Sequence, residues 1–586
     1  MGRILALTFT NKAAGELRQR VRDEISKLPE GLFIGTFHSF GKHVLESHGD
    51  TIGLAPGFSV FDTDDQIELI SRLQRSGQIP SSLDSRAVAF RVNRLKGLLS
   101  VTAAPIDQPQ KHLTPIPEFA VQYDAAMRRA RAVDFADLIY LPNVLLAAHP
   151  ERLELLQTAY RTILVDEFQD TTPGQYALLK RLSGPDRAPV FAVADEDQLI
   201  YEWNEARMET INNFLTDFRA EVTFASRSHR CPPVVVSAAN SVIRHNIFRF
   251  PNKPAIQSST TNQLQDRIAL MEAEDGDNEA KQVSELVGQL VGHSARPNEI
   301  AILARANWLL DGIERQLDSL GIPAERPSTA GLGETEEAEF VLRLLKWIAN
   351  PRDEQSMRVV LLNLFPNDAD SLDKAVVENM AQGAEPVSSL WELAKVGAGG
   401  PGLQRFLAAQ ANWMTRSSSV NSLLPAVSSD LREVFIEGAG RGEESQKGIL
   451  EAVRILTGRG AQLHPRGRTS VTDFLFELPK TVSTEPEGSD VTSLLTLHQS
   501  KGLEFPYVFI IGLENGILPD YRAKGQERVM EEERRLFYVG LTRARKRVFL
   551  SYARKRADSS GRVREREPSS FIEEIPENLI ERLHPS

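Results

Sequence analysis

The chain has 586 residues, a hydrophobic content of 41%, a charged content of 25% and a formal net charge of −11. Its length exceeds what one hydrophobic core supports, so we expect several domains of a globular protein. The negative charge argues against a protein that coats nucleic acid indiscriminately, but it remains compatible with a local basic track. The sequence contains no run of about 18 apolar residues, which excludes a membrane-spanning helix.

Cysteine usage and the first residues indicate the compartment. With Cys231 as its single cysteine, the chain has no internal disulfide framework and no cysteine-based zinc cluster, which suits a reducing cytoplasm. Met1 leads at once into a short apolar run without a secretory pattern. We therefore expect a cytoplasmic protein.

Two short strands are predicted near the start of the chain. The apolar run Ile4–Phe9 predicts a buried strand, and a helix follows to about Lys27, with Thr10 or Asn11 as its N-cap. A helix N-terminus points backbone N–H groups at whatever binds there. Phe33–Phe40 predicts the second strand.

Side chains near the ends of these strands are candidates for contact with nucleic acid. The hydroxyl and imidazole groups of Thr36, His38 and Ser39 could bind phosphates, while Phe9 and Phe37 could stack on bases. Packing in the core is the alternative for each of these two aromatic residues.

The most informative stretch is the apolar run Ile163–Val165 followed by Asp166 and Glu167. A buried strand that ends in acidic residues presents carboxylates at the carboxyl edge of a parallel sheet, where ligands bind. Asp166 would lie near Mg²⁺, directly or through water, and Glu167 would activate a water for in-line attack on a phosphoryl group. A strand end with a solvated acidic cap is the alternative, and the neighbouring motifs decide between the two.

A further strand, Val190–Ala194, ends at Asp195 and is followed by Gln198, Tyr201 and Trp203. A glutamine just beyond a strand end is well placed to contact a terminal phosphate, and the two aromatic rings offer stacking faces. Acid, amide and aromatic groups this close together predict a junction between nucleotide and nucleic acid. The alternative is an acidic loop with a surface aromatic residue.

The C-terminal half combines α/β layers with a long helical region over residues 334–478, in which no repeat or catalytic constellation occurs. Strands are predicted over Glu299–Arg305, Val491–Leu497 and Val508–Ile511, and a charged helix over Glu531–Arg545. Between Tyr521 and Glu567 the sequence has 15 Lys/Arg against 7 Asp/Glu, a local excess of eight positive charges. This excess indicates either a nucleic-acid track or a solvated basic tail.

Taken in chain order, these stretches resemble the motifs of UvrD/Rep/PcrA-type superfamily 1A DNA helicases. The resembling strings are Thr8–Ala14 for motif Ia, Gly35–Ser39 for Ib, Val165–Asp170 for II, Asp195–Trp203 for III, Ser228–Arg230 for IV, His498–Phe505 for V and Tyr538–Ala544 for VI. One such string is a weak signal, whereas seven in family order over nearly the whole chain are specific.

The resemblance implies an α/β fold with two RecA-like parallel-sheet domains, 1A and 2A, and two helical insertions, 1B and 2B. It assigns domain 1A to residues 1–60 and 132–243, insertion 1B to 61–131, domain 2A to 244–333 and 487–586, and insertion 2B to 334–486. It places an ATP site between the two RecA-like domains.

The resemblance also implies cofactors, residues and an activity. It assigns Asp166 to Mg²⁺, Glu167 to the attacking water, Gln198 to γ-phosphate sensing, Arg230 and Arg543 to charge stabilisation, and His229 and Glu504 to adenine and ribose. It assigns contact with single-stranded DNA to Phe9, Thr36, His38, Tyr201, Trp203 and His498. The implied activity is ATP-driven 3′ to 5′ translocation with strand separation at single/double-strand junctions, in repair or recombination, near the nucleoid if the source is bacterial.

The family's glycine-rich phosphate loop, which ends in Gly-Lys-Thr/Ser before the first strand, has no counterpart in the 586 residues. Its backbone N–H groups cradle phosphates and its lysine reaches the β- and γ-phosphates. A parallel strand so close to Met1 would also leave an apolar sheet edge open. His229 stands where the family usually has a tyrosine, and Asn204 stands where it usually has an arginine. These two departures put the efficiency of coupling between ATP hydrolysis and translocation in doubt. We expect a start codon assigned too late or a chain cut from a longer one; the alternative is a non-hydrolysing DNA-binding or scaffold protein with a helicase fold.

The intact mass of the endogenous protein tests this expectation. We expect a mass above the 65.2 kDa of this chain, with additional N-terminal residues that carry a Gly-Lys-Thr/Ser loop. A mass that matches Met1–Ser586 would favour the non-hydrolysing DNA-binding protein.

Overall fold

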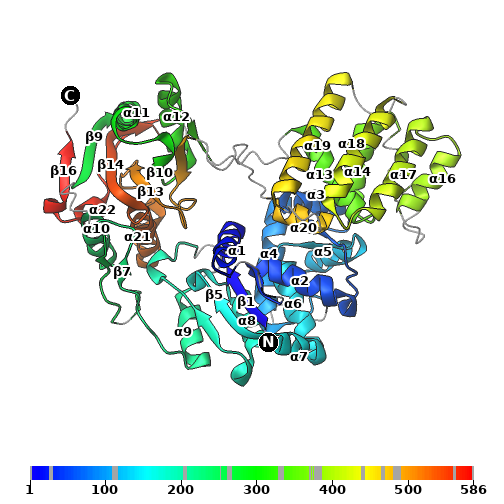
Figure 1. Cartoon of the computed structure of the whole chain (residues 1–586), viewed down its shortest axis with the longest axis horizontal. Coiled ribbons are helices and arrows are strands. Elements are labelled where there is room, and N and C mark those ends of the chain that lie inside the picture. The colour runs from blue at the N-terminus through cyan, green and yellow to red at the C-terminus, as the bar shows by residue number, and fades with distance from the viewer. Residues whose placement is uncertain are drawn as a thin grey trace. The chain divides into compact units, whose positions relative to one another are not determined.

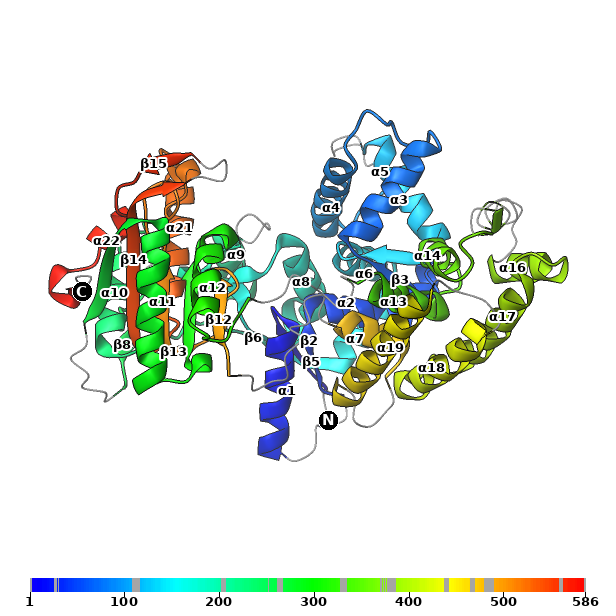
Figure 2. The same ribbon diagram turned by 90° about the horizontal axis from the view of Figure 1, so that it is seen from above.

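The computed structural model shows an α/β protein, drawn in Figure 1 and turned by 90° in Figure 2. It describes residues 3–25, 29, 31–107, 116–201, 207–250, 252–260, 267–326, 335–368, 371–372, 374, 376, 386–436, 442–463, 469–478, 490–557 and 562–583. The chain divides into two compact units: unit 1 is Met1–Ile163, Pro173–Pro189 and Thr329–Val482, and unit 2 is Leu164–Thr172, Val190–Ser328 and Ser483–Ser586. The four-part division into 1A, 1B, 2A and 2B stays a prediction.

Unit 2 contains an eight-stranded sheet in the order β11-β12-β10-β13-β14-β9-β16, with β15 paired to β14. Neighbours along this order are parallel, and β15 runs antiparallel to β14. The strands are β9 Ile268–Asp275, β10 Ile300–Ala304, β11 Ala324–Glu325, β12 Thr492–Thr496, β13 Phe505–Ile511, β14 Ala544–Ala557, β15 Val563–Glu565 and β16 Ile580–Leu583. The three strands predicted in this part of the chain are confirmed as β10, β12 and β13.

Helices cover both faces of this sheet, as a parallel sheet requires. The helices of unit 2 are α9 Met208–Phe218, α10 Pro233–Ile243, α11 Gly276–His293, α12 Leu310–Ser319, α21 Glu527–Leu541 and α22 Ser570–Glu573. Successive strand residues point to opposite faces. In β10, Ile302 packs in the core under α11 and α12, whereas Leu303 packs in the core with α10 and α21. Figure 1 shows the two helix layers on either side of the strands.

A second sheet has the order β2-β1-β5-β6, and the boundary between the units passes through β5. Its strands are β1 Arg3–Thr8, β2 Phe33–Thr36, β5 Tyr160–Val165 and β6 Val190–Ala192. β1 and β2 are parallel. Among the strands that the structure describes, β6 lies at the edge, where Phe191 is 65% exposed and Val193 is 50% exposed. Two largely parallel sheets with many helices confirm the predicted α/β class.

The prediction of a strand over Phe33–Phe40 is wrong in its second half. β2 ends at Thr36, and helix α2 (Phe37–His48) begins at the next residue. Ser39 N donates to Thr36 Oγ1 at 3.1 Å, and Thr36 N donates to Ser39 Oγ at 2.6 Å. This capping box satisfies the free N–H groups at the helix start and outweighs the β-propensity of the phenylalanines. Phe37 is consequently buried in the core.

Unit 1 contains two helical bodies with separate apolar cores. The first consists of α3 Thr63–Arg75, α4 Ser85–Thr102 and α5 Glu118–Arg129, next to the strand pair β3 Ser59–Phe61 and β4 Ala132–Asp134. The second consists of α13 Glu336–Ala349, α14 Glu354–Leu364, α16 Pro386–Lys395, α17 Gly400–Thr415, α18 Val420–Ile436, α19 Glu443–Leu463 and α20 Val471–Glu477. The other helices of unit 1 are α1 Asn11–Ile25, α2, α6 Asp137–Ala148, α7 Pro150–Ala159 and α8 Pro173–Arg187. Among the described helices, none combines the length and the apolar character needed to span a membrane.

Asp65 joins the two helical bodies inside unit 1. Its side chain, which is fully buried in α3, forms ion pairs with Arg343 and, at 2.8 Å, with Lys346 Nζ, both on α13. Asn350, just after α13, donates from Nδ2 to Ser59 Oγ at 3.1 Å. A buried carboxylate without a cation is strongly unfavourable. The pairing of Asp65 therefore holds α3 against α13.

A second buried ionic cluster centres on Lys96 of α4. Lys96 has a fully buried side chain, and its Nζ lies 2.6 Å from Asp134 Oδ2 and 2.7 Å from Asp137 Oδ1. The Tyr123 hydroxyl donates to Asp134 Oδ2 at 3.1 Å. Burial and the neighbouring Asp134 carboxylate raise the pKa of Asp137 to about 7. Lys96 compensates both carboxylates and so joins α4 to the β4–α6 connection.

We expect Lys96→Met to lower the free energy of unfolding by about 3–5 kcal/mol, because it leaves buried carboxylates without their cation. Urea unfolding at neutral pH, followed by circular dichroism, measures the change. Lys12→Met, at an exposed position of α1, is the control and should change it by less than about 0.5 kcal/mol. Equal losses in the two variants would contradict a stabilising role for Lys96.

Candidate functional site

The turn after β5 holds Asp166 and Glu167. Asp166 is exposed, and its Oδ1 accepts a hydrogen bond from Glu167 N at 3.0 Å. Glu167 has a φ of 51°, in the left-handed region that residues other than glycine rarely adopt. Gln169 Nε2 donates to Glu167 Oε2 at 2.5 Å. The uncommon backbone conformation and this hydrogen bond hold the Glu167 carboxylate at the carboxyl edge of the sheet.

Gln198 connects several elements of unit 2 from the end of the 3₁₀ turn Glu196–Gln198. Its Nε2 donates to Asp195 Oδ2 at 2.7 Å, and its Oε1 accepts from Arg543 Nη2 at 3.0 Å. Gln169 Oε1 accepts from Asp195 N at 3.0 Å, which joins the turn after β5 to the turn after β6. The predicted base Glu167 and the predicted sensor Gln198 therefore belong to one hydrogen-bond network.

Arg543 lies in the turn between α21 and β14. The predicted helix extends too far, because α21 ends at Leu541 and β14 begins at Ala544. The Arg543 guanidinium is buried, and its Nε donates to Val539 O at 2.9 Å. Burial, together with the nearby charge of Arg230, lowers the pKa of Arg543 to about 10. A buried guanidinium of this kind favours an anion beside it.

Arg230 faces the same small cavity as Arg543. Its Nε lies 2.5 Å from Glu504 Oε2, and its Nη1 donates to Thr542 O at 3.3 Å. Burial alone would raise the pKa of Glu504, but the ion pair with Arg230 holds it below its usual value. A cavity of about 110 Å³ is lined by Gln198, Arg230 and Arg543, among others. Two guanidinium groups and an amide around one cavity suit an anion of the phosphate type.

Lys501 was not among the predicted site residues, yet it contacts three parts of this network. Its Nζ lies 2.5 Å from Asp170 Oδ2 and 3.9 Å from Glu167 Oε2, and it donates to Gln198 O at 2.8 Å. Burial raises the pKa of Asp170 to about 6, although Lys501 opposes this shift. Lys501 is therefore the counter-ion of the only fully buried carboxylate among the described residues of the turn after β5.

The residues of this turn fit a Mg²⁺ site of the kind that nucleotides complete. Among the described residues, no group of three or more His, Cys, Asp or Glu side chains is arranged to hold a metal ion. Mg²⁺ is usually bound by one or two carboxylates together with waters and substrate phosphates. Asp166, exposed directly after β5, offers one such carboxylate, and its assignment to Mg²⁺ stays a prediction. The exposed His229, next to Arg230, stays a prediction as the adenine contact.

Two of the predicted DNA contacts meet in unit 2. The rings of Tyr201 and His498 lie 6.3 Å apart between centroids, and the Tyr201 hydroxyl donates to His498 O at 3.4 Å. Burial, assisted by Arg305, lowers the pKa of His498 to about 4, so its imidazole is neutral at pH 7. Lys501 Nζ lies 5.2 Å from the centre of the Tyr201 ring. Trp203 lies outside the described residues.

Three other predicted DNA contacts lie in unit 1. Phe9 is half-buried after β1, and Thr36 uses its hydroxyl to cap α2. Burial lowers the pKa of His38 to about 4, which makes its ring neutral. The centroid of this ring lies 6.0 Å from that of Phe135, which is 42% exposed. A neutral imidazole beside an exposed aromatic ring is a suitable surface for stacking on bases.

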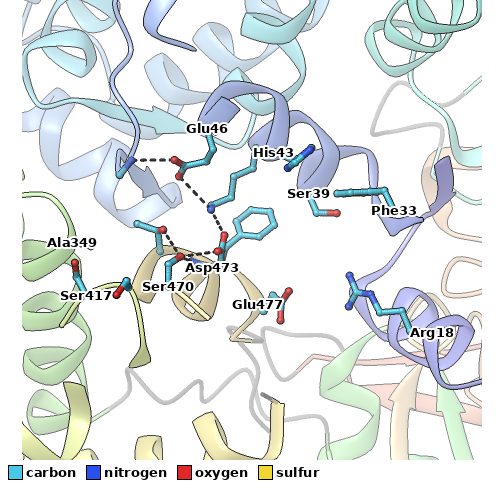
Figure 3. Close-up of a pocket in the computed structure, with 15 residues that line it drawn as sticks. Arg18, Phe33, Ser39, His43, Glu46, Ala349, Ser417, Ser470, Asp473 and Glu477 are labelled. Carbon is cyan, nitrogen blue, oxygen red and sulfur yellow. Dashed lines mark hydrogen bonds and ion pairs between the residues drawn. The ribbon is translucent and has the colours of Figure 1, made fainter. Parts of the chain in front are cut away.

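A larger cavity of about 450 Å³ lies in unit 1, between α2 and the second helical body (Figure 3). Lys42 Nζ lies 2.6 Å from Asp473 Oδ1 and 3.4 Å from Glu46 Oε1 at its wall. Figure 3 shows Arg18 and Glu477 on other parts of the lining. Charges of both signs line this cavity, so its electrostatics select neither anions nor cations.

Comparison with known proteins identifies the family of the chain. A family model described as UvrD/REP helicase N-terminal domain matches residues 1–219, and one described as UvrD-like helicase C-terminal domain matches residues 226–383 and 467–555. The chain belongs to the UvrD/REP helicase family. Over 99% of its length it is 30% identical to DNA helicase II of Haemophilus influenzae, of which it covers 82%. It is also 30% identical to the ATP-dependent DNA helicase PcrA of Bacillus subtilis and to DNA helicase II of Escherichia coli, covering 80% and 82% of them.

The basic stretch near the C-terminus of this UvrD/REP family member is largely paired inside unit 2. Arg534 lies 2.9 Å from Glu574, and Arg547 lies 2.7 Å from Glu581. Arg556 is buried against Glu279 and Glu514. These pairs use much of the local positive excess to hold β14 and α21 in place.

Lys501→Met tests the assignment of Lys501 as counter-ion of Asp170. The folded-state pKa of Asp170, about 6, lies above its ordinary value of 3.8, so ionisation of this carboxylate costs stability as the pH rises through this interval. Without Lys501 the pKa rises further and the cost extends to higher pH. We expect a loss of about 3–5 kcal/mol in the free energy of unfolding near pH 8 and a smaller loss near pH 5.

Urea unfolding at the two pH values measures both losses. Lys546→Met, whose side chain is 40% exposed, is the matched control and should change stability by less than about 0.5 kcal/mol at either pH. A loss for Lys501→Met that is the same at both pH values would show that Asp170 is not the group involved.

Proposed function

We propose that this chain is an ATP-dependent helicase that moves 3′ to 5′ along single-stranded DNA, separates strands at single/double-strand junctions and acts in repair or recombination. The observation that carries the proposal is the contact of Gln198 with both Asp195 and Arg543, because it joins a candidate phosphate sensor to a buried arginine at a small polar cavity. The names of the relatives, which are DNA helicases and in the case of PcrA ATP-dependent, support it.

The proposed chemistry uses the charges around this cavity. Mg²⁺ at Asp166 would neutralise phosphate charge. Glu167, held by Gln169, would accept a proton from the attacking water. Arg230 and Arg543 would stabilise the charge that develops on the transferred phosphoryl group. His229 and Glu504 are the proposed adenine and ribose contacts.

Contact with DNA is proposed for the aromatic and polar residues Phe9, Thr36, His38, Tyr201, Trp203 and His498. Stacking suits a motor that passes over any sequence, because every base has a π-face. In unit 2 the proposed DNA contact Tyr201 and the proposed phosphate sensor Gln198 share one partner, Lys501. Lys501 donates to the Gln198 carbonyl and also lies against the Tyr201 ring. A change at Gln198 on ATP binding or hydrolysis would therefore reach the stacking residues directly.

Stimulation of ATP hydrolysis by DNA tests the proposed function. We expect the endogenous protein to hydrolyse ATP only when single-stranded DNA is present, because the network joins sensor and DNA contacts. Steady-state rates with and without an oligonucleotide measure this dependence. Equal turnover under both conditions would refute a translocase, and DNA binding without turnover would favour the non-hydrolysing DNA-binding alternative.

Glu167→Gln tests the catalytic assignment. A carboxamide cannot accept the proton from water, so we expect kcat to fall by at least about 10²-fold while ATP still binds. Single-turnover rates and titration with a fluorescent ATP analogue separate the two effects. Glu285→Gln, at a position 52% exposed on α11, is the matched control. A kcat in Glu167→Gln equal to that of this control would remove Glu167 from the role of base.

A further inference from the structure

Three consecutive carboxylates follow β6, immediately before Gln198. Asp195, Glu196 and Asp197 are held close together by their 3₁₀ turn, and like charges at such separations repel one another. Two cations from the segment after α10, Arg249 and Lys253, face this turn. Both form ion pairs with these carboxylates.

Lys253 contacts all three carboxylates. Its Nζ lies 2.6 Å from Asp195 Oδ1, 3.0 Å from Glu196 Oε2 and 2.9 Å from Asp197 Oδ2. An ammonium group has three N–H donors, so one donor is available for each carboxylate. The side chain is only 14% exposed. This geometry defines a fixed position for Lys253, unlike that of a solvated surface lysine.

Arg249 binds the same turn in a different way. Its Nε and Nη2 donate to the two oxygens of Asp197 at 2.8 and 2.6 Å. No hydrogen bond or ion pair between Arg249 and Asp195 occurs among the described residues. The two cations therefore differ in their partners: both bind Asp197, but of the two only Lys253 also binds Asp195 among the described residues.

The two oxygens of Asp195 have separate partners. Oδ1 faces Lys253 Nζ at 2.6 Å and also accepts from Asp197 N at 3.2 Å, and Oδ2 accepts from Gln198 Nε2 at 2.7 Å. This leaves Gln198 Oε1 to accept from Arg543 Nη2 at 3.0 Å. Without Lys253, Asp195 would turn away from its neighbouring carboxylates. The Gln198 amide could then rotate and present its NH₂ group to the Arg543 guanidinium, which cannot accept a hydrogen bond.

We propose that Lys253 is a positioning residue for ATP hydrolysis, which acts through Asp195 and Gln198 to hold Arg543 at the cavity. This inference rests on the proposed function. In the proposed site Lys253 touches no reacting atom. It acts through a series of contacts that runs from Lys253 to Asp195, from Asp195 to Gln198 and from Gln198 to Arg543. Because small misplacements of a charge-stabilising group are costly in catalysis, the expected effect is on turnover more than on ATP affinity.

Kinetics of three variants tests the proposal in the DNA-stimulated reaction. We expect Lys253→Met to lower kcat by about 10²-fold and to change KM for ATP by less than about threefold. Lys253→Arg should recover part of this loss, because it keeps the charge but its planar fork matches three separate carboxylates less well. Arg249→Met is the matched control, because Arg249 binds Asp197 of the same turn but makes no contact with Asp195 among the described residues. A kcat in Lys253→Met equal to that in Arg249→Met would overturn the proposal.

Hydrogen–deuterium exchange of the nucleotide-free protein provides a test that does not depend on turnover. We expect the segment Asp195–Tyr201 to exchange faster in Lys253→Met than in either the wild type or Arg249→Met. If the wild type does not hydrolyse ATP with DNA present, the proposed function fails and this measurement alone decides the inference. Exchange of this segment at the wild-type rate in Lys253→Met would overturn it.

Discussion

Carboxylates at the ends of β5 and β6 can leave bulk water only where a cation or an N–H group faces them, and the site depends on this constraint. Asp170 is buried against Lys501, and Asp195 is held by Lys253. Such pairs need not add net stability compared with apolar residues, but the loss of one partner leaves a charge uncompensated. The two lysines therefore act mainly by selecting one geometry of the acidic turns. Gln198, whose carbonyl and side chain are bound from different directions, takes its position from that geometry.

The same constraint organises unit 1. Asp65 on α3 is buried against Arg343 and Lys346 on α13. Lys96 on α4 is buried against Asp134 and Asp137. Apolar packing alone specifies one arrangement less strictly, because apolar cores lose uniqueness before they lose stability when their side chains are exchanged. A buried ion pair allows only the register in which both charges meet. Selection of one arrangement is a role that such pairs fulfil in some proteins, and the geometry here is consistent with it.

The sequence predicted those features that depend on local patterns. Apolar runs of strand length predicted β10, β12 and β13. Polar residues beyond strand ends made Glu167 and Gln198 candidates, because parallel strands present their carboxyl ends at a common edge. The structure joins these two residues in one hydrogen-bond network, and their catalytic roles stay predictions. The strand predicted over Phe33–Phe40 failed because a capping box at Thr36 starts a helix, a signal that competes with β-propensity within four residues.

The lysines of the site could not be predicted in the same way. Lys501 lies within a recognised motif, but its partner Asp170 is 331 positions away, and no local pattern pairs them. Lys253 lies in a segment with no motif, where a lysine is most often solvated. Charge partners that are distant in sequence meet only once the fold has formed. The hydrogen-bond network around Gln198 therefore depends on contacts between residues distant in sequence, which local patterns do not predict.

The position of Gln198 matters for any proposed coupling of ATP to DNA. Its side chain contacts Arg543 at the cavity, while its carbonyl accepts from Lys501, which also faces the Tyr201 ring three residues later. A sensor bound only through its side chain could respond to phosphate and leave the main chain unmoved. A sensor bound through both groups transmits a change in one contact to the other, because the short turn has few free dihedral angles. In the proposed motor, this shared turn links the phosphate sensor Gln198 to the stacking residue Tyr201 within three residues.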